Sequence, residues 1–277
     1  MPSSIPSVIE QQTRWAKGKG LEPKNAYLAS VSGNLREKQL SVRTENEFRK
    51  GDGGELRESG VRPAKMRALR SSAVLAVNVF DYWRSPRDAA PLQRALELTD
   101  RISEICFEQP FSTRLPGHPP NLDVVLALEG HRKIAIESKF TEWLSPRKLS
   151  FDPKYFPVEK DLWSSKGLPN CQALATGFSE PEPFRFLNLP QLLKHALGLA
   201  GKKKDGANEL WYIYFDWKCP ERITHAEELK RFADLVGEEI PFRALTYQDL
   251  FHRLQSTIHP DDAPYLEYLR DRYPAEK

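Results

Sequence analysis

Two acidic residues and a lysine near the middle of the chain have types and spacing that could support metal-assisted hydrolysis. Asp123 lies within one apolar segment, and Glu137 and Lys139 lie two positions apart in the next. Two carboxylates brought together repel each other, and a divalent cation with oxygen ligands, such as Mg²⁺ or Mn²⁺, offsets that repulsion. The metal would polarise a phosphoryl oxygen and acidify a bound water. The lysine would position or deprotonate that water and stabilise the developing negative charge.

The two apolar segments are expected to form a β-hairpin that brings these side chains together. Residues 121–128 and 133–140 have strand composition, and residues 129–131 between them form a turn. If the turn is centred on Gly130, the two carboxylates face each other across the strands, and strand alternation places the lysine on the same face. The backbone carbonyl of Ser138, between the second carboxylate and the lysine, is a further candidate metal ligand.

An ordinary hairpin surface is the alternative interpretation. An aspartate followed later by Glu-x-Lys is common by chance, and Glu137 with Lys139 would then form a solvated surface pair. Three features favour a site. The charged residues interrupt very apolar strands, the register pairs the carboxylates, and the Pro- and Gly-rich segment 115–120 leaves the Asp123 end of its strand accessible.

The surrounding pattern predicts an α/β fold, with a sheet covered by helices on both faces. Apolar residues recur at helical spacing in five segments, which are 64–83, 89–106, 189–201, 226–236 and 247–255. Two further strands are expected at 209–217, which is strongly apolar and aromatic, and at 242–245.

The N-terminal region differs from the rest in charge and patterning. The 277 residues contain 41 Lys and Arg against 38 Asp and Glu, for a net charge of +3. Residues 1–70 hold 14 basic and 8 acidic residues, and the remainder holds 27 and 30. We therefore expect a basic, partly flexible arm over residues 1–62, with helices around 10–17 and 34–50, and a mildly acidic domain over residues 63–277.

Composition also limits where the protein works. With 40% hydrophobic residues, including 10% aromatic, the chain can build a sizeable core. Its longest apolar stretches are too short to span a bilayer, and its polar start does not match a secretory signal. The cysteines are three in number and widely spaced, as expected for reduced thiols. These features predict a cytoplasmic protein without a membrane partner.

The motif resembles the PD-(D/E)xK nuclease superfamily, which includes type II restriction endonucleases, Holliday junction resolvases and RecB-like nucleases. The resemblance rests on Asp123, fourteen positions before Glu137-Ser138-Lys139, on a hairpin that follows a helix. Asn121-Leu122-Asp123 replaces the usual Pro-Asp dipeptide and leaves the carboxylate in place. A bacterial restriction-endonuclease-like group is similar over more of the chain, at residues 70–73, 78–80, 121–126, 136–142 and 191–197.

The resemblance implies a restriction-endonuclease-like core of helix, three-strand meander, helix and strand, with flanking helices. It also implies Mg²⁺ dependence, with Mn²⁺ as a substitute, and DNA as substrate. Asp123 and Glu137 carry over as metal ligands and Lys139 as the catalytic lysine. An extra carboxylate is implied on the helix before the hairpin. Glu104 and Glu97 share a helical face there, and Glu104 is favoured because it is nearer the sheet, although a solvated glutamate is the alternative.

Gln191 matches a glutamine on the following helix of some superfamily members. Its i+4 neighbour His195 shares its face. Gln191 would hold a phosphate or the attacking water, and a capping or packing role is the alternative.

These expectations combine into a Mg²⁺-dependent endonuclease that hydrolyses DNA phosphodiester bonds and is restriction-like. The alternatives are a structure-selective nuclease of DNA repair or recombination, and a DNA-binding module whose nuclease fold has lost turnover. A restriction role usually needs a homodimer to cut both strands, but the sequence reveals no interface. The basic arm would hold duplex DNA against the site through counterion release.

Overall fold

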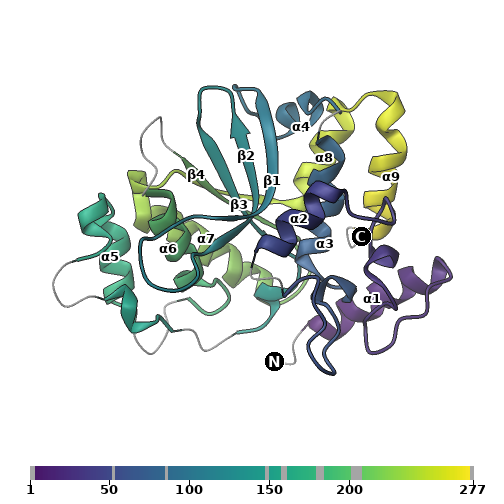
Figure 1. The fold of residues 1–277 in the computed structure, drawn as a ribbon, viewed down its shortest axis with the longest axis horizontal. Coiled ribbons are helices and arrows are strands. Elements are labelled where there is room, and N and C mark those ends of the chain that lie inside the picture. Colours follow the sequence, from purple (N-terminus) through teal and green to yellow (C-terminus); the bar gives the residue numbers. More distant parts are fainter. Residues whose placement is uncertain are drawn as a thin grey trace.

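The computed structural model describes residues 4–51, 54–84, 87–146, 150–156, 161–178, 184–200 and 208–274. At its centre lies one five-stranded mixed sheet (Figure 1) with the strand order β1-β2-β3-β4-β5. The strands are β1 Ile102–Pro110, β2 Asn121–Leu128, β3 Lys133–Lys139, β4 Glu209–Tyr214 and β5 Phe242–Thr246. Strands β1, β2 and β3 pair antiparallel, and β4 and β5 continue the sheet in parallel with β3.

Helices cover both faces of the sheet. They are α1 Ile5–Gly18, α2 Val42–Lys50, α3 Ser72–Phe80, α4 Ala90–Ala95, α5 Pro169–Thr176, α6 Leu189–Ala200, α7 Glu221–Val236, α8 Tyr247–Thr257 and α9 Ala263–Arg272. Adjacent residues of β3 point to opposite faces of the sheet. Glu137 contacts Gln191 of α6, and Ser138 contacts Tyr247 of α8. The α/β prediction is therefore confirmed.

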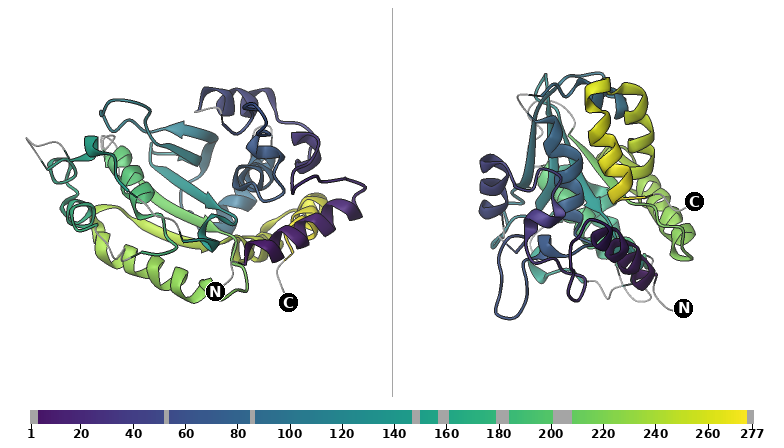
Figure 2. Two further views of the ribbon diagram at one scale, coloured as in Figure 1. Left: turned by 90° about the horizontal axis from the view of Figure 1, so that it is seen from below. Right: turned by 90° about the vertical axis from the view of Figure 1, so that its right-hand side faces the viewer.

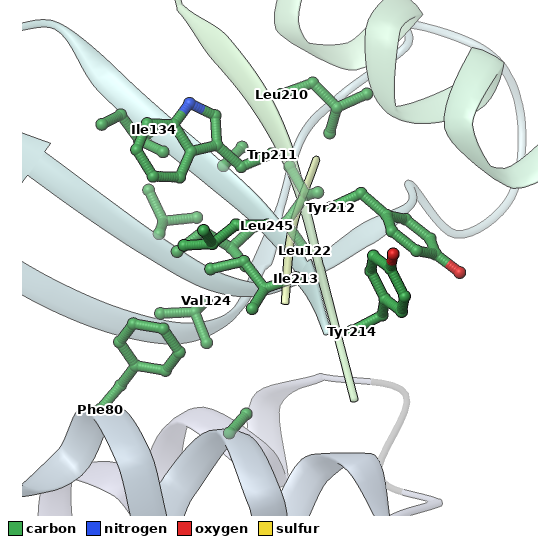
Figure 3. Packing of buried hydrophobic residues seen from close by; sticks show 14 of the residues in the cluster. Phe80, Leu122, Val124, Ile134, Leu210, Trp211, Tyr212, Ile213, Tyr214 and Leu245 are labelled. Atoms are coloured by element: carbon green, nitrogen blue, oxygen red, sulfur yellow. The ribbon is translucent and has the colours of Figure 1, made fainter. Parts of the chain in front are cut away.

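Buried side chains on both faces of β4 hold these layers together. Leu210, Trp211, Tyr212, Ile213 and Tyr214 are all buried, as expected for a central strand. In Figure 3, Phe80 of α3 lies below Val124 of β2, while Tyr212 and Tyr214 point to one side of β4. Each large apolar side chain buried in this way contributes roughly 1.5–3 kcal/mol.

The hairpin and the C-terminal half follow the sequence pattern closely. The strands expected at 121–128, 133–140, 209–217 and 242–245 correspond to β2, β3, β4 and β5, and the helices at 189–201, 226–236 and 247–255 correspond to α6, α7 and α8. Gly201, the expected end of the first of these helices, lies outside the described residues. Gly130 and His131 have positive φ values of 88° and 70°, which is the tight turn expected between β2 and β3.

The predicted helix over residues 89–106 is wrong. Only α4 is helical, and β1 begins at Ile102. The pairing of β1 with β2 is irregular between Ile102 and Glu104, and a β-bulge of this kind changes which face the following residues occupy. Ile102 and Ile105 are consequently both buried. Their three-residue spacing imitates the period of a helix.

The predicted helix over residues 64–83 is shorter than expected. Residues Lys65–Arg67 form a separate 3-10 turn, and α3 starts only after Ser71. The Ser71 hydroxyl accepts a hydrogen bond from the Val74 amide at 3.2 Å. This N-cap satisfies one of the free amides at the start of the helix and fixes where it begins.

The N-terminal residues pack on the same core as the sheet. Val8, Leu35 and Phe48 belong to the main apolar cluster. Figure 2 shows α1 beside α9, where the Trp15 indole donates a hydrogen bond to Asp271 at 3.0 Å. A domain division at residue 62 stays a prediction, although the helices expected around 10–17 and 34–50 overlap α1 and α2. Within the described residues, no helix is long and apolar enough to cross a membrane.

A glycine allows α6 to approach the chain that follows β1. A Cβ atom added at Gly198 would lie 2.8 Å from the Cβ of Phe111 and 2.9 Å from its backbone oxygen. Both separations are shorter than an ordinary van der Waals contact. The close packing of α6, and therefore the position of its N-terminus, depends on the missing side chain.

We expect Gly198→Ala to destabilise the protein by about 1–3 kcal/mol, because α6 must move away from Phe111. Urea unfolding followed by circular dichroism measures the change. Gly18→Ala at the end of α1 is the matched control, since no atom lies within 4 Å of its added Cβ. Equal stability of the two variants would contradict the assigned role of Gly198.

Candidate active site

The register of the hairpin brings Asp123 and Glu137 to facing positions. Val124 pairs with Ile136, as predicted from the turn, and the next residues outward are the two carboxylates. The regular β2–β3 pairing ends there. The Asp123 Oδ2 atom instead accepts a hydrogen bond from the backbone N–H of Ser138 at 2.7 Å. The Asp123 carboxylate is therefore tied to the strand that carries Glu137.

Glu137 is the centre of a buried polar network, and its side chain is only 1% exposed. Its Oε1 atom accepts hydrogen bonds from Lys139 Nζ and from Gln191 Nε2, the latter at 2.8 Å. Lys139 Nζ also donates to Gln191 Oε1 at 3.1 Å. His195 Nε2 lies 2.8 Å from the other oxygen, Oε2. The structure thus brings Glu137 and Lys139 together, as the hairpin pattern predicts. It also places beside them Gln191, which the resemblance had singled out, and His195.

The buried charges give the two carboxylates different pKa values. Burial opposes ionisation of Glu137, but Lys139 and His195 outweigh it and lower its pKa to about 2. Burial and the charge of Glu137 raise the pKa of Asp123 well above its usual value. Burial also opposes the charge of Lys139, yet Glu137 and Asp123 together raise its pKa. The electrostatics of the site therefore favour the charges of Glu137 and Lys139 and oppose the charge of Asp123.

The start of α6 is fixed by two sets of hydrogen bonds. Asn188 Oδ1 accepts from the Gln191 amide at 3.2 Å, and Asn188 Nδ2 donates to Gln191 Oε1 at 3.2 Å. The backbone N–H groups of residues 185–187 donate to the buried carboxylate of Glu228 on α7 at 2.6, 2.9 and 2.7 Å. Glu228 thus anchors the segment from which Gln191 reaches Glu137. Its neighbours in sequence did not indicate this role.

Strand β1 supplies a further carboxylate that the sequence analysis missed. The residues on either side of Glu108 pair with those on either side of Asp123, so Glu108 faces Asp123 across the strands. Burial, together with the charges of Glu55 and Glu137, raises the pKa of Glu108 to about 7. The sequence analysis missed Glu108 because it assigned residues up to 106 to a helix and placed no strand before β2.

Glu104 does not join this group. It lies on β1 and not on a helix, its side chain is 49% exposed, and it forms an ion pair with Arg43. It lies four positions before Glu108 on the strand, or roughly 13 Å away along it. Glu97, the other helical candidate, forms an exposed ion pair with Arg243 at 2.6 Å. The expected placement of Glu104 on a helix is therefore wrong, and its role as a metal ligand stays a prediction.

Ser138 contributes to the site through its backbone. Its hydroxyl points to the opposite face of the sheet and lies 2.6 Å from the Tyr247 hydroxyl, while its amide donates to Asp123. The role of its carbonyl as a metal ligand stays a prediction. Among the described residues, no group of three or more His, Cys, Asp and Glu side chains has an arrangement that could hold a metal ion.

Water and substrate have different access to the two carboxylates. Asp123 is partly exposed, whereas Glu137 is buried. A cavity of about 50 Å³ borders the Lys139 and Gln191 side chains, and this volume holds water but not a nucleotide. The remaining lining residues are Glu142, Trp143, Ser145, Arg185, Phe186, Asn188 and Tyr212. Of the two carboxylates, only Asp123 is therefore open to solvent.

One comparison places the chain among known sequences. A family model described as "Restriction Endonuclease associating with ARP" matches residues 9–274. The chain belongs to this family. The match of this restriction endonuclease family extends from within α1 to the end of α9, so every site residue described above lies inside it. No curated protein and no solved structure matches the chain.

We expect Asp123→Asn to stabilise the metal-free protein. Asp123 has a higher pKa in the folded than in the unfolded protein. Its protonated form therefore stabilises the fold below about pH 4, and this stability is lost as pH rises through the folded-state pKa of Asp123. Asparagine stays neutral and can still accept from the Ser138 amide. The advantage of the variant should therefore grow as pH rises above about 4. Urea unfolding across this range measures it, and a pH-independent difference would contradict the raised pKa.

Proposed function

We propose that this protein is a Mg²⁺-dependent endonuclease of the PD-(D/E)xK type that hydrolyses DNA phosphodiester bonds, with a restriction-like role. The observation that carries the proposal is the convergence of Asp123, Glu137 and Lys139 on one face at the end of the β2–β3 hairpin. The chain order α3, β1–β3, α6, β4 supports it, because it follows the helix, three-strand meander, helix and strand of that superfamily. Membership of a restriction endonuclease family supports it as well.

The residues at the hairpin fit a Mg²⁺ ion by the chemistry of their donor atoms. Asp123 and Glu137 offer carboxylate oxygens, and the Ser138 carbonyl offers a third. Few protein ligands suffice, because Mg²⁺ keeps several waters and is usually held by one or two carboxylates plus substrate phosphates. We propose that Glu108 takes the role expected of Glu104. When bound, Mg²⁺ would polarise a phosphoryl oxygen and acidify a bound water.

The other polar residues would act on charge and orientation. Lys139 holds its proton firmly because its pKa is raised, so it suits stabilisation of negative charge on the reacting phosphate better than removal of a proton from water. Gln191 holds both Lys139 and Glu137 through the two ends of its amide. Gln191 would keep the Lys139 amine and the Glu137 carboxylate in the same relative orientation while the substrate binds.

An arginine-lined groove offers contacts for the rest of a DNA duplex. The groove, of about 630 Å³, is lined by residues from both sides of the proposed domain boundary, including Arg36 and Arg87. The guanidinium carbons of these two residues lie 4.8 and 4.1 Å from the centre of the Tyr82 ring. Guanidinium groups bind backbone phosphates without reading sequence. This groove could perform the DNA-holding role expected of the N-terminal arm.

The nuclease proposal predicts metal-dependent DNA cleavage. Purified protein incubated with plasmid and phage DNA should produce cut products with Mg²⁺ or Mn²⁺ and none with a chelator. Asp123→Ala should reduce the cleavage rate at least about 100-fold, because it removes a metal-binding carboxylate. Gel electrophoresis of the products is the measurement. No cleavage of any substrate, or equal cleavage by the variant, would refute the proposal.

The same assay separates the two alternative functions. Cleavage of flaps or junctions in preference to a defined duplex sequence would indicate a repair or recombination nuclease. Tight DNA binding without metal binding would indicate a DNA-binding module that has lost nuclease activity. Calorimetry measures both the DNA affinity and the metal affinity. Sedimentation with and without DNA would test for the homodimer that double-strand cleavage usually needs.

The placement of Glu108 and Glu104 on one strand allows a matched comparison. Glu108→Ala should weaken Mn²⁺ binding about tenfold or more, because Glu108 faces Asp123. Glu104→Ala should leave it unchanged, because Glu104 is exposed and paired with Arg43. Isothermal titration calorimetry with Mn²⁺ measures both variants. A larger effect from Glu104→Ala would restore the original assignment.

A further inference from the structure

The Arg185 side chain is exposed and has no role in the site as described so far. It belongs to residues 184–188, which lead into α6, and it lines the same small cavity as Lys139. Trp143 and Tyr212, which also line that cavity, are at most 2% exposed. The cavity therefore runs from buried aromatic rings toward the surface, and Arg185 lies at its open end.

Buried contacts hold the backbone that carries Arg185. Its own N–H donates to the Glu228 carboxylate at 2.6 Å. Phe184 and Leu187 on either side of it are fully buried. The guanidinium carbon of Arg185 lies 5.3 Å from the centre of the Phe186 ring, which is within the range of a cation–π contact. The position from which the guanidinium group extends is therefore set by the core and not by solvent.

Within the described part of the chain, Arg185 has no acidic partner. The arginines of the groove described above differ in this respect, because each of them forms an ion pair. They are Arg36, Arg43, Arg84 and Arg87, and their partners are Glu37, Glu104, Glu47 and Asp262. The charge of Arg185 is thus more available to an anion from solvent than the charges of the groove.

The charges that line the cavity favour an anion. Lys139 and Arg185 are the basic residues of the lining, and Glu142 is the acidic one. The Glu142 Oε2 atom already accepts hydrogen bonds from the backbone N–H groups of Phe140 and Thr141, at 2.8 and 2.9 Å. Because the cavity holds water but not a nucleotide, a phosphate group bound here would stay at the open end, beside Arg185.

We propose that Arg185 binds a backbone phosphate of the DNA strand that is cut at the site. The inference rests on the proposed function, because DNA is the ligand, and it adds a substrate contact to that site. Two N–H groups of one guanidinium can donate to two oxygens of the same phosphate, which a lysine ammonium does not reproduce. Lys139, whose side chain is 12% exposed, acts on the reacting phosphate, and Arg185 holds the strand at the surface. The contact carries no sequence information, because every nucleotide has the same phosphate.

The salt dependence of DNA binding tests this contact without any cleavage. The full chain is titrated into a fluorescently labelled duplex with a chelator present, and anisotropy gives the affinity at several salt concentrations. Each phosphate contact contributes about 0.9 to the slope of log affinity against log salt concentration, so Arg185→Ala should reduce that slope by about 0.9. It should also weaken the binding of duplexes of unrelated sequence equally. Arg185→Lys keeps the charge and should keep the wild-type slope, with a lower affinity.

Arg231 on α7 provides the matched control. It is exposed, and its guanidinium carbon lies 5.4 Å from the centre of the Phe184 ring, a contact of the same kind as that of Arg185. Arg231 is not among the residues that line the cavity. Arg231→Ala changes the net charge of the protein by the same amount as Arg185→Ala, and it should leave the salt slope unchanged. Thermal unfolding shows whether each variant is folded, and Arg185→Gln replaces the alanine variant if that variant does not fold.

Duplexes with one uncharged methylphosphonate in place of a phosphate locate the contact. Moving this group along the strand should reveal a position that lowers the affinity of wild type but not that of Arg185→Ala, because the substitution has already removed the partner. No such position would overturn the inference. Equal salt slopes for wild type and Arg185→Ala, or a slope as low for Arg185→Lys as for Arg185→Ala, would also overturn it.

The same measurements distinguish this inference from the proposed function. Metal-dependent cleavage by a protein whose salt slope does not depend on Arg185 would overturn the inference and leave the proposed function standing. DNA binding with the expected slopes but no cleavage would overturn the proposed function alone. A wild-type protein that binds no DNA would overturn both.

Discussion

The enforced proximity of Asp123 and Glu137 is the constraint on which the site depends. Two unit charges about 5 Å apart repel by roughly 3 kcal/mol at an effective dielectric constant of about 20. The hairpin nevertheless holds them at facing positions, because the Gly130 turn and the apolar residues set its register. A shift of the pairing by one residue would move the buried apolar side chains to the opposite face of the sheet. The protein accommodates the repulsion unequally, because Lys139 lowers the pKa of Glu137, whereas burial and the charge of Glu137 raise the pKa of Asp123.

Remote packing keeps α6 where this electrostatic arrangement needs it. The absent side chain of Gly198 permits contact with Phe111, and Glu228 on α7 holds the segment that leads into the helix. From that position, Gln191 and His195 reach opposite oxygens of Glu137. The orientation of one carboxylate therefore depends on contacts from α6 and α7 as well as from its own strand.

Much of the sheet and part of the site could be predicted because both depend on local sequence. Alternation, a short turn and an apolar run are enough to place β2, β3 and β4, and the turn alone sets which residue faces Asp123. The sequence did not show that Glu108, and not Glu104, faces Asp123. A bulge early in β1 gives its buried residues the spacing of a helix, so the strand was not expected there. Gln191 was selected by resemblance. Its contact with Glu137 depends on how α6 packs across the sheet.

The sequence by itself determined the hairpin, its register and the identity of the Asp123, Glu137 and Lys139 group, because turn geometry and strand alternation act between near neighbours. Only the tertiary structure decided that Glu108 faces Asp123 and that His195 lies against Glu137 Oε2. Those relations join residues from different elements, and their distances depend on how the whole core packs. The N-terminal residues show the same limit, since their charge was visible in sequence but the packing of Val8 and Phe48 into the core was not.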